Sequence, residues 1–205
     1  MKIESIKVGR YDKEKLVIRL EGGEYISARV DDAYTLRVGD EISEEEAERL
    51  NASYSLTLAK KSAAKTLAKR SLSRSELSKK LREKGFSEEE SEEAVEWFSS
   101  RGFIDDESYA RSCVEYYKAR GYGVVRIKEE LYRRGISKEL SQKLISELGS
   151  LSDELLRLIE KKTRGENLDA DKKRKLVAFL CRRGFKYDEI RAALENACID
   201  TEEIF

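Results

Sequence analysis

The sequence predicts a mainly α-helical fold of tandem three-helix repeats, elongated in shape, with a small antiparallel β-sheet at its N-terminus. The first supporting observation is a recurring pattern: an apolar residue, three variable residues, Leu, two variable residues, Lys or Arg, Gly, and then Phe or Ile. The second is the composition, because 40% of the residues are charged and proline is absent, which is typical of long solvated helices. The third is a change of character before residue 43, where short alternating runs of β-branched and aromatic residues replace the helical pattern.

The repeated pattern has a simple physical explanation. Its glycines are Gly85, Gly135 and Gly184, at nearly constant spacing, and a period of this length indicates a repeat protein. A glycine can adopt the left-handed conformation that ends a helix, and the basic residue before it complements the negative pole of the helix dipole. In each copy two apolar residues stand four apart and share a helix face: Leu77 with Leu81, Ile127 with Leu131, and Leu176 with Leu180.

Residues 1–42 predict a three-stranded antiparallel meander. Gly22-Gly23 separates the runs 16–20 and 25–30 and is a good turn signal. A sheet this small is marginally stable alone, so we expect it to pack on a neighbouring helix. Acidic residues outnumber basic ones by eight to one over residues 31–48, which indicates either a solvated face or a docking surface for a basic partner.

The helical part divides into three triplets. The expected division is 1–53 for the β subdomain and its linking helix, then 54–102, 103–149 and 150–205 for the repeats. Helix starts are predicted at capping boxes, in which a Ser and a Glu three residues later satisfy each other's backbone N–H groups, with single N-caps elsewhere. The boxes are Ser43 with Glu46, Ser73 with Glu76 and Ser87 with Glu90, and the single caps are Ser137 and either Asp105 or Asp106.

The composition also excludes several classes of function. Without histidine, this chain cannot contain a Ser-His-Asp or Cys-His catalytic triad, a histidine zinc site or imidazole acid–base chemistry. Cys113, Cys181 and Cys198 form no close pair, which fits the reducing cytoplasm better than a disulfide framework. The N-terminus shows no signal peptide, and no apolar run is long enough to cross a membrane. A cytoplasmic, monomeric protein without membrane partner, metal or cofactor is expected.

The second helix of each triplet is rich in Lys and Arg. Because stacked repeats place equivalent helices in similar orientations, we expect a positive stripe that follows a phosphate backbone, although a merely solvated helix surface is the alternative. The candidate residues for binding a protein or nucleic acid are Lys60, Lys61, Lys65, Lys69, Arg70, Arg74, Lys79, Lys80, Arg82, Arg126, Arg133, Arg134, Lys173, Arg174, Arg182 and Arg183.

Two other groups of residues favour structural roles. Base stacking on exposed aromatic rings is conceivable, but the helical spacing of most of them favours core packing. The aromatic group is Trp97, Phe98, Tyr109, Tyr116, Tyr117, Tyr122 and Tyr132. Asp105-Asp106 and the glutamates of 88–93 stand at predicted helix starts, where capping is favoured over metal binding. No glycine-rich nucleotide-binding loop and no active site can be identified.

Several stretches resemble the bacterial RecX regulatory proteins over about residues 57–197. They are 74–86, then Phe103-Ile104-Asp105-Asp106 with Tyr109-Ala110, then 123–136, and finally Arg182-Arg183-Gly184-Phe185 with Asp188 and Ile190. The N-terminal sheet resembles an extension that only longer members of the family carry. The resemblance implies tandem three-helix units.

The resemblance also implies a non-catalytic modulator, most often an inhibitor, of the RecA recombinase. Such proteins bind RecA and its filament on single-stranded DNA, and limit filament extension, strand exchange and the co-protease activity of the SOS response. The residues leave two alternatives open: an autonomous DNA-binding protein that reads the major groove with helix-turn-helix-like units, or a helical scaffold for proteins.

Overall fold

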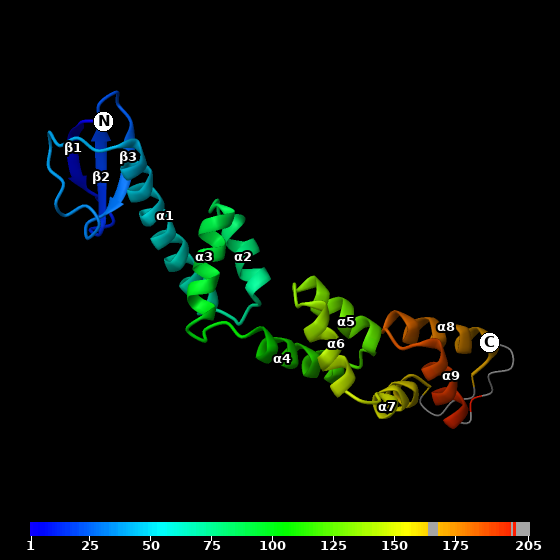
Figure 1. Ribbon diagram of the computed structural model, residues 1–205. Helices are drawn as coiled ribbons and strands as arrows, with labels where there is room; N and C mark the ends of the chain where they lie inside the picture. The colour runs from blue at the N-terminus through cyan, green and yellow to red at the C-terminus, as the bar shows by residue number, and fades with distance from the viewer. Residues whose placement is uncertain (164–167, 198, 200–205) are drawn as a thin grey trace. The chain divides into compact units, whose positions relative to one another are not determined.

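The computed structural model describes residues 1–163, 168–197 and 199. It forms two compact units: unit 1 comprises Met1–Ser71 with Leu77–Ile104, and unit 2 comprises Leu72–Glu76 with the chain from Asp105 onward. The order of elements along the chain is shown in Figure 1. They are β1 (Ile3–Val8), β2 (Lys15–Leu20), β3 (Tyr25–Arg29), α1 (Glu44–Leu67), α2 (Arg74–Arg82), α3 (Glu88–Ser99), α4 (Asp106–Ala119), α5 (Val124–Arg133), α6 (Lys138–Glu147), α7 (Ser152–Thr163), α8 (Ala170–Arg182) and α9 (Tyr187–Asn196).

The N-terminal strands form the predicted meander. The sheet has the order β1-β2-β3, and both neighbouring pairs are antiparallel. Ile18 and Leu20 of β2 are fully buried, and they share a hydrophobic cluster with Ala47 and Leu50 of α1. The first turns of α1 therefore cover the sheet, as expected for three strands that cannot bury enough apolar surface by themselves.

Helix α1 is longer than the sequence pattern indicated. The linking helix expected from Ser43 and the helix expected from Tyr54 are one continuous helix of 24 residues. No glycine or proline interrupts this stretch, and its buried residues recur at helical spacing. The hydroxyl of Ser43 accepts a hydrogen bond from the N–H of Glu46, as predicted for the cap. Neither α1 nor any other helix in the described part of the chain combines the length and apolar character that crossing a membrane requires.

The three glycines of the repeated pattern end α2, α5 and α8 in the predicted way. Their φ angles are +94° for Gly85, +70° for Gly135 and +88° for Gly184, all in the left-handed region. In each copy the N–H of the next residue donates to the carbonyl oxygen of the pattern's Leu, five residues earlier. These bonds join Phe86 to Leu81 at 3.3 Å, Ile136 to Leu131 at 3.1 Å and Phe185 to Leu180 at 3.3 Å.

The predicted helix starts are also present. Ser87 and Glu90 form a reciprocal capping box at α3. Ser73 and Glu76 do the same at α2, with N–H to side-chain oxygen distances of 3.2 and 3.0 Å. Asp105 caps α4, so the choice left open between Asp105 and Asp106 is decided.

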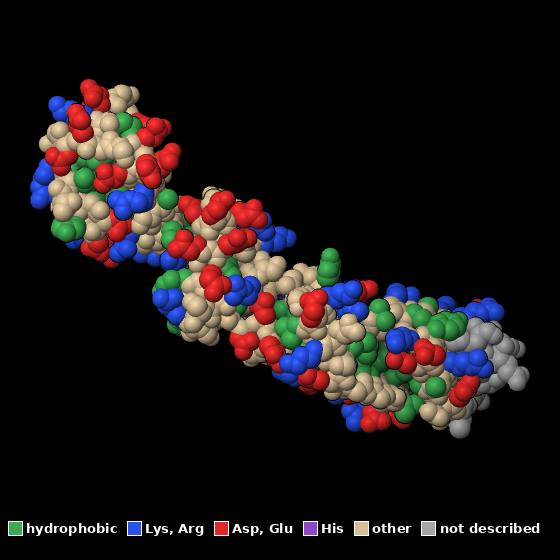
Figure 2. Space-filling view, in the orientation of Figure 1, with side chains coloured by type: hydrophobic (Ala, Val, Ile, Leu, Met, Phe, Trp, Pro, Cys, Tyr) green, Lys and Arg blue, Asp and Glu red, His purple; other side chains and the backbone are tan. Residues whose placement is uncertain are grey.

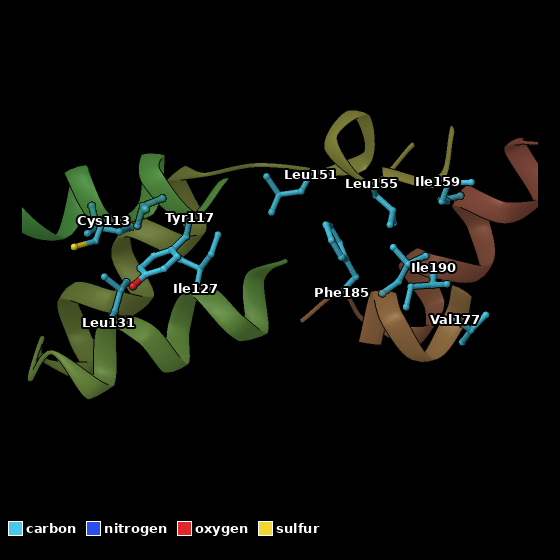
Figure 3. Close-up of a cluster of buried hydrophobic side chains, with 14 of the residues drawn as sticks. Cys113, Tyr117, Ile127, Leu131, Leu151, Leu155, Ile159, Val177, Phe185 and Ile190 are labelled. Carbon is cyan, nitrogen blue, oxygen red and sulfur yellow. The ribbon is translucent and has the colours of Figure 1, made fainter. Parts of the chain in front are cut away.

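Unit 2 is organised around one hydrophobic cluster that runs through both of its triplets. Figure 3 shows Tyr117, Ile127 and Leu131 on one side and Leu155 and Ile190 on the other, all turned inward from their helices. Ile127, Leu131, Leu155 and Ile190 are at most 1% exposed. The triplets α4–α6 and α7–α9 therefore share a core, as expected for repeats that are too small to be stable alone.

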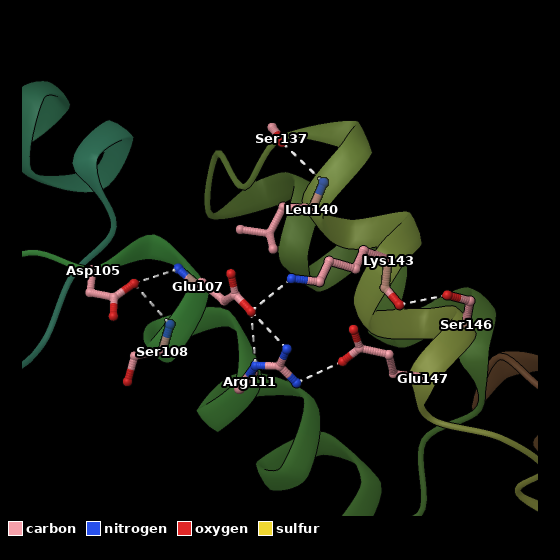
Figure 4. A network of polar contacts seen from close by, with 9 residues as sticks. All are labelled: Asp105, Glu107, Ser108, Arg111, Ser137, Leu140, Lys143, Ser146 and Glu147. Atoms are coloured by element: carbon pink, nitrogen blue, oxygen red, sulfur yellow. Dashed lines mark hydrogen bonds and ion pairs between the residues drawn. The ribbon is translucent and has the colours of Figure 1, made fainter.

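Charged side chains bridge α4 and α6 on the surface of unit 2 (Figure 4). Arg111 pairs with Glu147 at 2.7 Å, and Lys143 reaches Glu107 at 3.0 Å. Hydrogen bonds from Arg111 and Lys143 lower the pKa of the Glu107 carboxyl below its ordinary value. Because these groups are exposed, the pairs set the local geometry and add little stability.

Candidate partner and nucleic-acid interface

The predicted cations of unit 1 fall into two groups. Lys60, Lys61 and Arg82 already face carboxylates, with distances of 3.5 Å to Glu93, 2.7 Å to Glu14 and 3.7 Å to Glu88. The others are five basic residues around the end of α1 and on α2, and the described part of the chain provides no ion pair for them. These are Lys65, Lys69, Arg70, Lys79 and Lys80. Unit 1 therefore offers an external anion a group of available positive charges.

Helix α5 is less positive than its sequence indicated. Arg126 lies 3.0 Å from both Glu129 and Glu130, and Arg133 also pairs with Glu130. Each glutamate is three or four residues from its arginine along the chain, so these are ion pairs between side chains on one face of α5. A phosphate would have to compete with them for the same guanidinium groups.

Arg134 has an internal role. Its guanidinium donates to the hydroxyls of Tyr109 and Tyr117 at 2.6 and 3.0 Å, and lies 3.3 Å from the carboxylate of Glu76. Burial and the hydrogen bond to Glu76 raise the pKa of Tyr109 above its ordinary value. The Nε atom of Arg134 is buried without a partner among the described residues. The side chain thus holds α4 and the start of α2 within unit 2, and an outside partner cannot easily reach it.

The cations of α8 differ among themselves. Arg174 pairs loosely with Asp171 at 3.8 Å, and Lys173 is half-buried. Arg182 is exposed and has no ion pair within the described ranges. Arg183 lies over the rings of Tyr122 and Phe179, at 4.9 and 5.1 Å from their centroids. Arg74, at the start of α2, is exposed, and its backbone N–H donates to Oδ1 of Asp106 at 2.8 Å.

The aromatic residues follow the packing expectation only in part. Tyr117 and Phe98 are buried, whereas Tyr132 is 79% exposed and Tyr116 is 52% exposed. Tyr132 stands on α5, where its ring is open to solvent. Base stacking therefore stays possible at Tyr132 and Tyr116 and is blocked by burial at Tyr117.

The carboxylates cap helices, as predicted. Oδ1 of Asp105 accepts hydrogen bonds from the N–H groups of Glu107 and Ser108 at 2.9 and 3.1 Å. Acidic side chains gather where α3 begins (Figure 2), and Glu88, Glu89 and Glu90 form its first turn. Within residues 1–163, 168–197 and 199, no group of three or more acidic or cysteine side chains converges as metal ligands would. Cys198 lies outside the described residues.

Sequence reasoning missed one feature of unit 1, a groove of 620 Å³ between α1 and α3. Trp97 and Phe103 line it on one side, Ala64 and Leu67 of α1 line it on the other, and Lys61 is a further lining residue. The available signal was the pair Ala64 and Ala68, whose small side chains leave room opposite the large rings. Periodicity alone could not show that this helix face remains uncovered.

Comparison with known proteins identifies the family. Sequence models for the first, second and third three-helix domains of RecX match residues 59–98, 105–145 and 152–194, which together make up more than half of the chain. The chain belongs to the RecX family. The three matched ranges correspond to the triplets α1–α3, α4–α6 and α7–α9.

Relatives named "Regulatory protein RecX" support this assignment. The protein from Trichlorobacter lovleyi is 34% identical over 58% of this chain and 82% of its own length. The protein from Pelodictyon phaeoclathratiforme is 36% identical over 64% of this chain and 84% of its own length. The chain is therefore a RecX-type regulatory protein.

Solved structures of RecX proteins share the fold. One of them matches with a TM-score of 0.69 at 20% identity, and the match spans 95% of this chain and 98% of the other. RecX from Lactobacillus salivarius covers 70% of this chain and is itself covered to 97%, with a TM-score of 0.63 at 23% identity. Because the first match spans 95% of this chain, it includes residues of the N-terminal sheet. A sheet followed by three triplets therefore occurs elsewhere among RecX proteins.

Proposed function

We propose that this RecX protein is a cytoplasmic, non-catalytic modulator of the RecA recombinase. It binds RecA and the RecA filament on single-stranded DNA, and it limits filament extension, strand exchange and the co-protease activity of the SOS response. Membership of a family of regulatory proteins supports this proposal. The proposed DNA binding rests mainly on the surface cations that have no ion pair within the described part of the chain.

The contact set follows from the ion pairs. We propose that phosphate or acidic protein surface is bound by Lys65, Lys69, Arg70, Lys79, Lys80 and Arg182, with Arg74, Lys173, Arg174 and Arg183 at the margins. Lys60, Lys61, Arg82, Arg126 and Arg133 would join only by exchanging their present carboxylate partners. Arg134 contributes through the stability of unit 2, because its guanidinium makes internal contacts.

The test is the rate of single-stranded-DNA-dependent ATP hydrolysis by RecA from the same organism, titrated with this protein at fixed salt. Inhibition at protein levels well below those of RecA supports action on filament ends or grooves. Inhibition only at levels that coat the DNA indicates simple competition for phosphate. An absence of any effect, together with tight binding to one duplex sequence, would instead support the DNA-reader alternative.

A variant with three neutralised cations sharpens the test. Lys69→Gln, Lys79→Gln and Arg182→Gln remove exposed charges, while the matched control Lys7→Gln, Lys13→Gln and Lys128→Gln removes three exposed charges elsewhere. Each lost phosphate contact should reduce the slope of log binding constant against log salt by about 0.7 on single-stranded DNA. The control should keep the original slope. Equal slopes for both variants would contradict the assignment of these cations.

A further inference from the structure

We propose that the groove between α1 and α3 of unit 1 is a docking site for a partner protein. Its occupant is an acidic peptide segment that inserts a bulky apolar side chain. This inference goes beyond the proposed DNA contact. The two proposals share Lys65, but the groove depends on Trp97 and Phe103, which the DNA contact does not use. It can therefore fail or hold independently of that proposal.

The groove has the size of one or two large side chains. Ala64 on α1 and Ala68 at its C-cap stand four residues apart, and their small side chains leave a hollow opposite Trp97 and Phe103. Leu67 lies between them on the same wall. The groove is open to solvent and has a volume of 620 Å³. Apolar anchors of partner proteins are usually buried in pockets of this kind.

The aromatic wall contains one exposed ring beside a half-buried and a buried one. The rings of Trp97 and Phe98 meet edge to face with centroids 4.8 Å apart, and Phe98 meets Phe103 in the same way at 5.8 Å. Phe98 is buried, but Phe103 is 65% exposed. Leaving such a ring in water is unfavourable, and a contiguous exposed apolar surface marks an interaction site. The existing contacts hold the rings in fixed positions, which lowers the entropic cost of binding.

The charges around the groove determine which partner fits. Lys60 and Lys61 line it, and an acidic segment would reach them by displacing their present partners Glu93 and Glu14. Lys65 follows one turn after Lys61 on the same flank of α1 and has no ion pair among the described residues. Arg101 lies over the Trp97 ring, 4.0 Å from its centroid. An apolar floor with cations along its rim is complementary to a segment that carries carboxylates beside its apolar anchor.

Nucleic acid is the weaker fit. The wall that carries Trp97 belongs to α3, which is acidic along its length, and Glu93 on this helix pairs with Lys60 at 3.5 Å. A sugar-phosphate backbone crossing the groove would bring phosphates close to these glutamates. A peptide can place its carboxylates on the α1 side only. The asymmetry between the two walls therefore favours a protein segment.

The chain contains a built-in probe for this site. Trp97 is its only tryptophan, so the fluorescence of the full-length protein reports directly on the groove. We would titrate the protein with a synthetic twelve-residue peptide of Asp, Glu, Leu and Phe, with neither DNA nor recombinase present. The expected result is a saturable blue shift that weakens as salt is added. The same peptide with Lys in place of Asp and Glu should bind at least about tenfold more weakly.

Variants test the two walls separately. Phe103→Ala should weaken the binding of the acidic peptide about tenfold or more, because the Phe103 ring becomes buried when the peptide binds. Lys65→Gln should weaken it about threefold. The matched controls are Tyr11→Ala, which removes a ring that is 93% exposed on the same unit, and Lys7→Gln on β1. Both controls should leave the affinity unchanged, and all four variants retain Trp97.

Three results would overturn the proposal. The first is a fluorescence titration without saturation. The second is equal binding of the acidic and basic peptides. The third is a saturable response to oligothymidylate that exceeds the response to the acidic peptide, which would make the groove a base-stacking site. Since none of these measurements includes RecA, they leave the proposed modulation of RecA to its own test.

Discussion

Two junctions within unit 2 use the same repeated pattern in different ways. At the first, the Arg134-Gly135 turn meets the start of α2: the hydroxyl of Ser73 donates to the carbonyl oxygen of Arg134, and Gly135 faces the side chain of Ser75. At the second, the Arg183-Gly184 turn meets the start of α5. Here the N–H groups of Gly123 and Val125 donate to the carbonyl oxygens of Arg183 and Gly184, at 2.8 and 3.1 Å.

The difference lies in which atoms make the contact. A side-chain hydroxyl reaches the turn at the first junction, whereas two backbones touch at the second, where a Cβ on Gly184 would lie 2.3 Å from the N atom of Arg126. The arginines differ correspondingly. Arg134 enters a partly buried network with Glu76, whereas Arg183 lies over aromatic rings and donates to the carbonyl oxygen of Arg120 at 2.7 Å. One sequence pattern therefore supports a polar junction made through side chains and a close-packed one made between two backbones.

The largest expected effect is at the close-packed junction. Gly184→Ala adds a methyl group where the backbone of α5 already lies, and it also places alanine at a φ of +88°. Overpacking and the left-handed conformation together should lower the free energy of unfolding by about 3 to 5 kcal/mol. Urea unfolding followed by circular dichroism measures the loss.

Gly85→Ala is the matched control, because Gly85 ends α2 at a φ of +94° with no atom within 4 Å of an added Cβ. Gly85→Ala should lower the free energy of unfolding by only about 1 kcal/mol, which is the cost of alanine in the left-handed conformation. If the two substitutions cost the same, the tight backbone contact at Gly184 would be refuted as the source of its effect.

The next effect distinguishes the two arginines. Arg134→Met leaves the carboxylate of Glu76 partly buried and without its cation, which should cost about 2 kcal/mol. Adding Glu76→Gln to that variant should restore part of the loss. Arg183→Met removes a stacked cation and should cost about 1 kcal/mol or less. Chemical denaturation of the four proteins checks the order, and a larger cost for Arg183→Met would reverse the comparison.

The smallest effect concerns pH. The pKa of Tyr109 is raised above its ordinary value of 10.0 in the folded protein, so the folded state holds this proton more tightly than the unfolded state. The resulting stabilisation is complete below about pH 10 and is lost as the pH rises further. Tyr109→Phe should cost about 1 kcal/mol at neutral pH through two lost hydrogen bonds, and should make unfolding less dependent on pH above 10.

Unfolding the wild type and Tyr109→Phe in urea at about pH 8 and pH 11 tests this. The difference in the free energy of unfolding between the wild type and Tyr109→Phe should be smaller at the higher pH. A constant difference would show that the Tyr109 proton is not held by the fold.

Much of the fold could be predicted from local sequence. The capping serines, the left-handed glycines and the meander depend on residues close together in the chain, and each was found where expected. The continuity of α1 through residues 53 and 54 was missed, because two adequate helix signals in succession look like two helices. At the candidate interface, the sequence identified the cations but could not identify which of them are already paired.

The sequence by itself determined that this chain is built from three helical triplets, because helix ends depend on short-range hydrogen bonds and backbone sterics. It also determined the family. Only the tertiary structure decided that Arg134 faces inward while Lys79 is exposed, and that α1 and α3 leave a groove beside Trp97. Those outcomes depend on which side chains from distant parts of the chain meet, and helical periodicity carries no information about that.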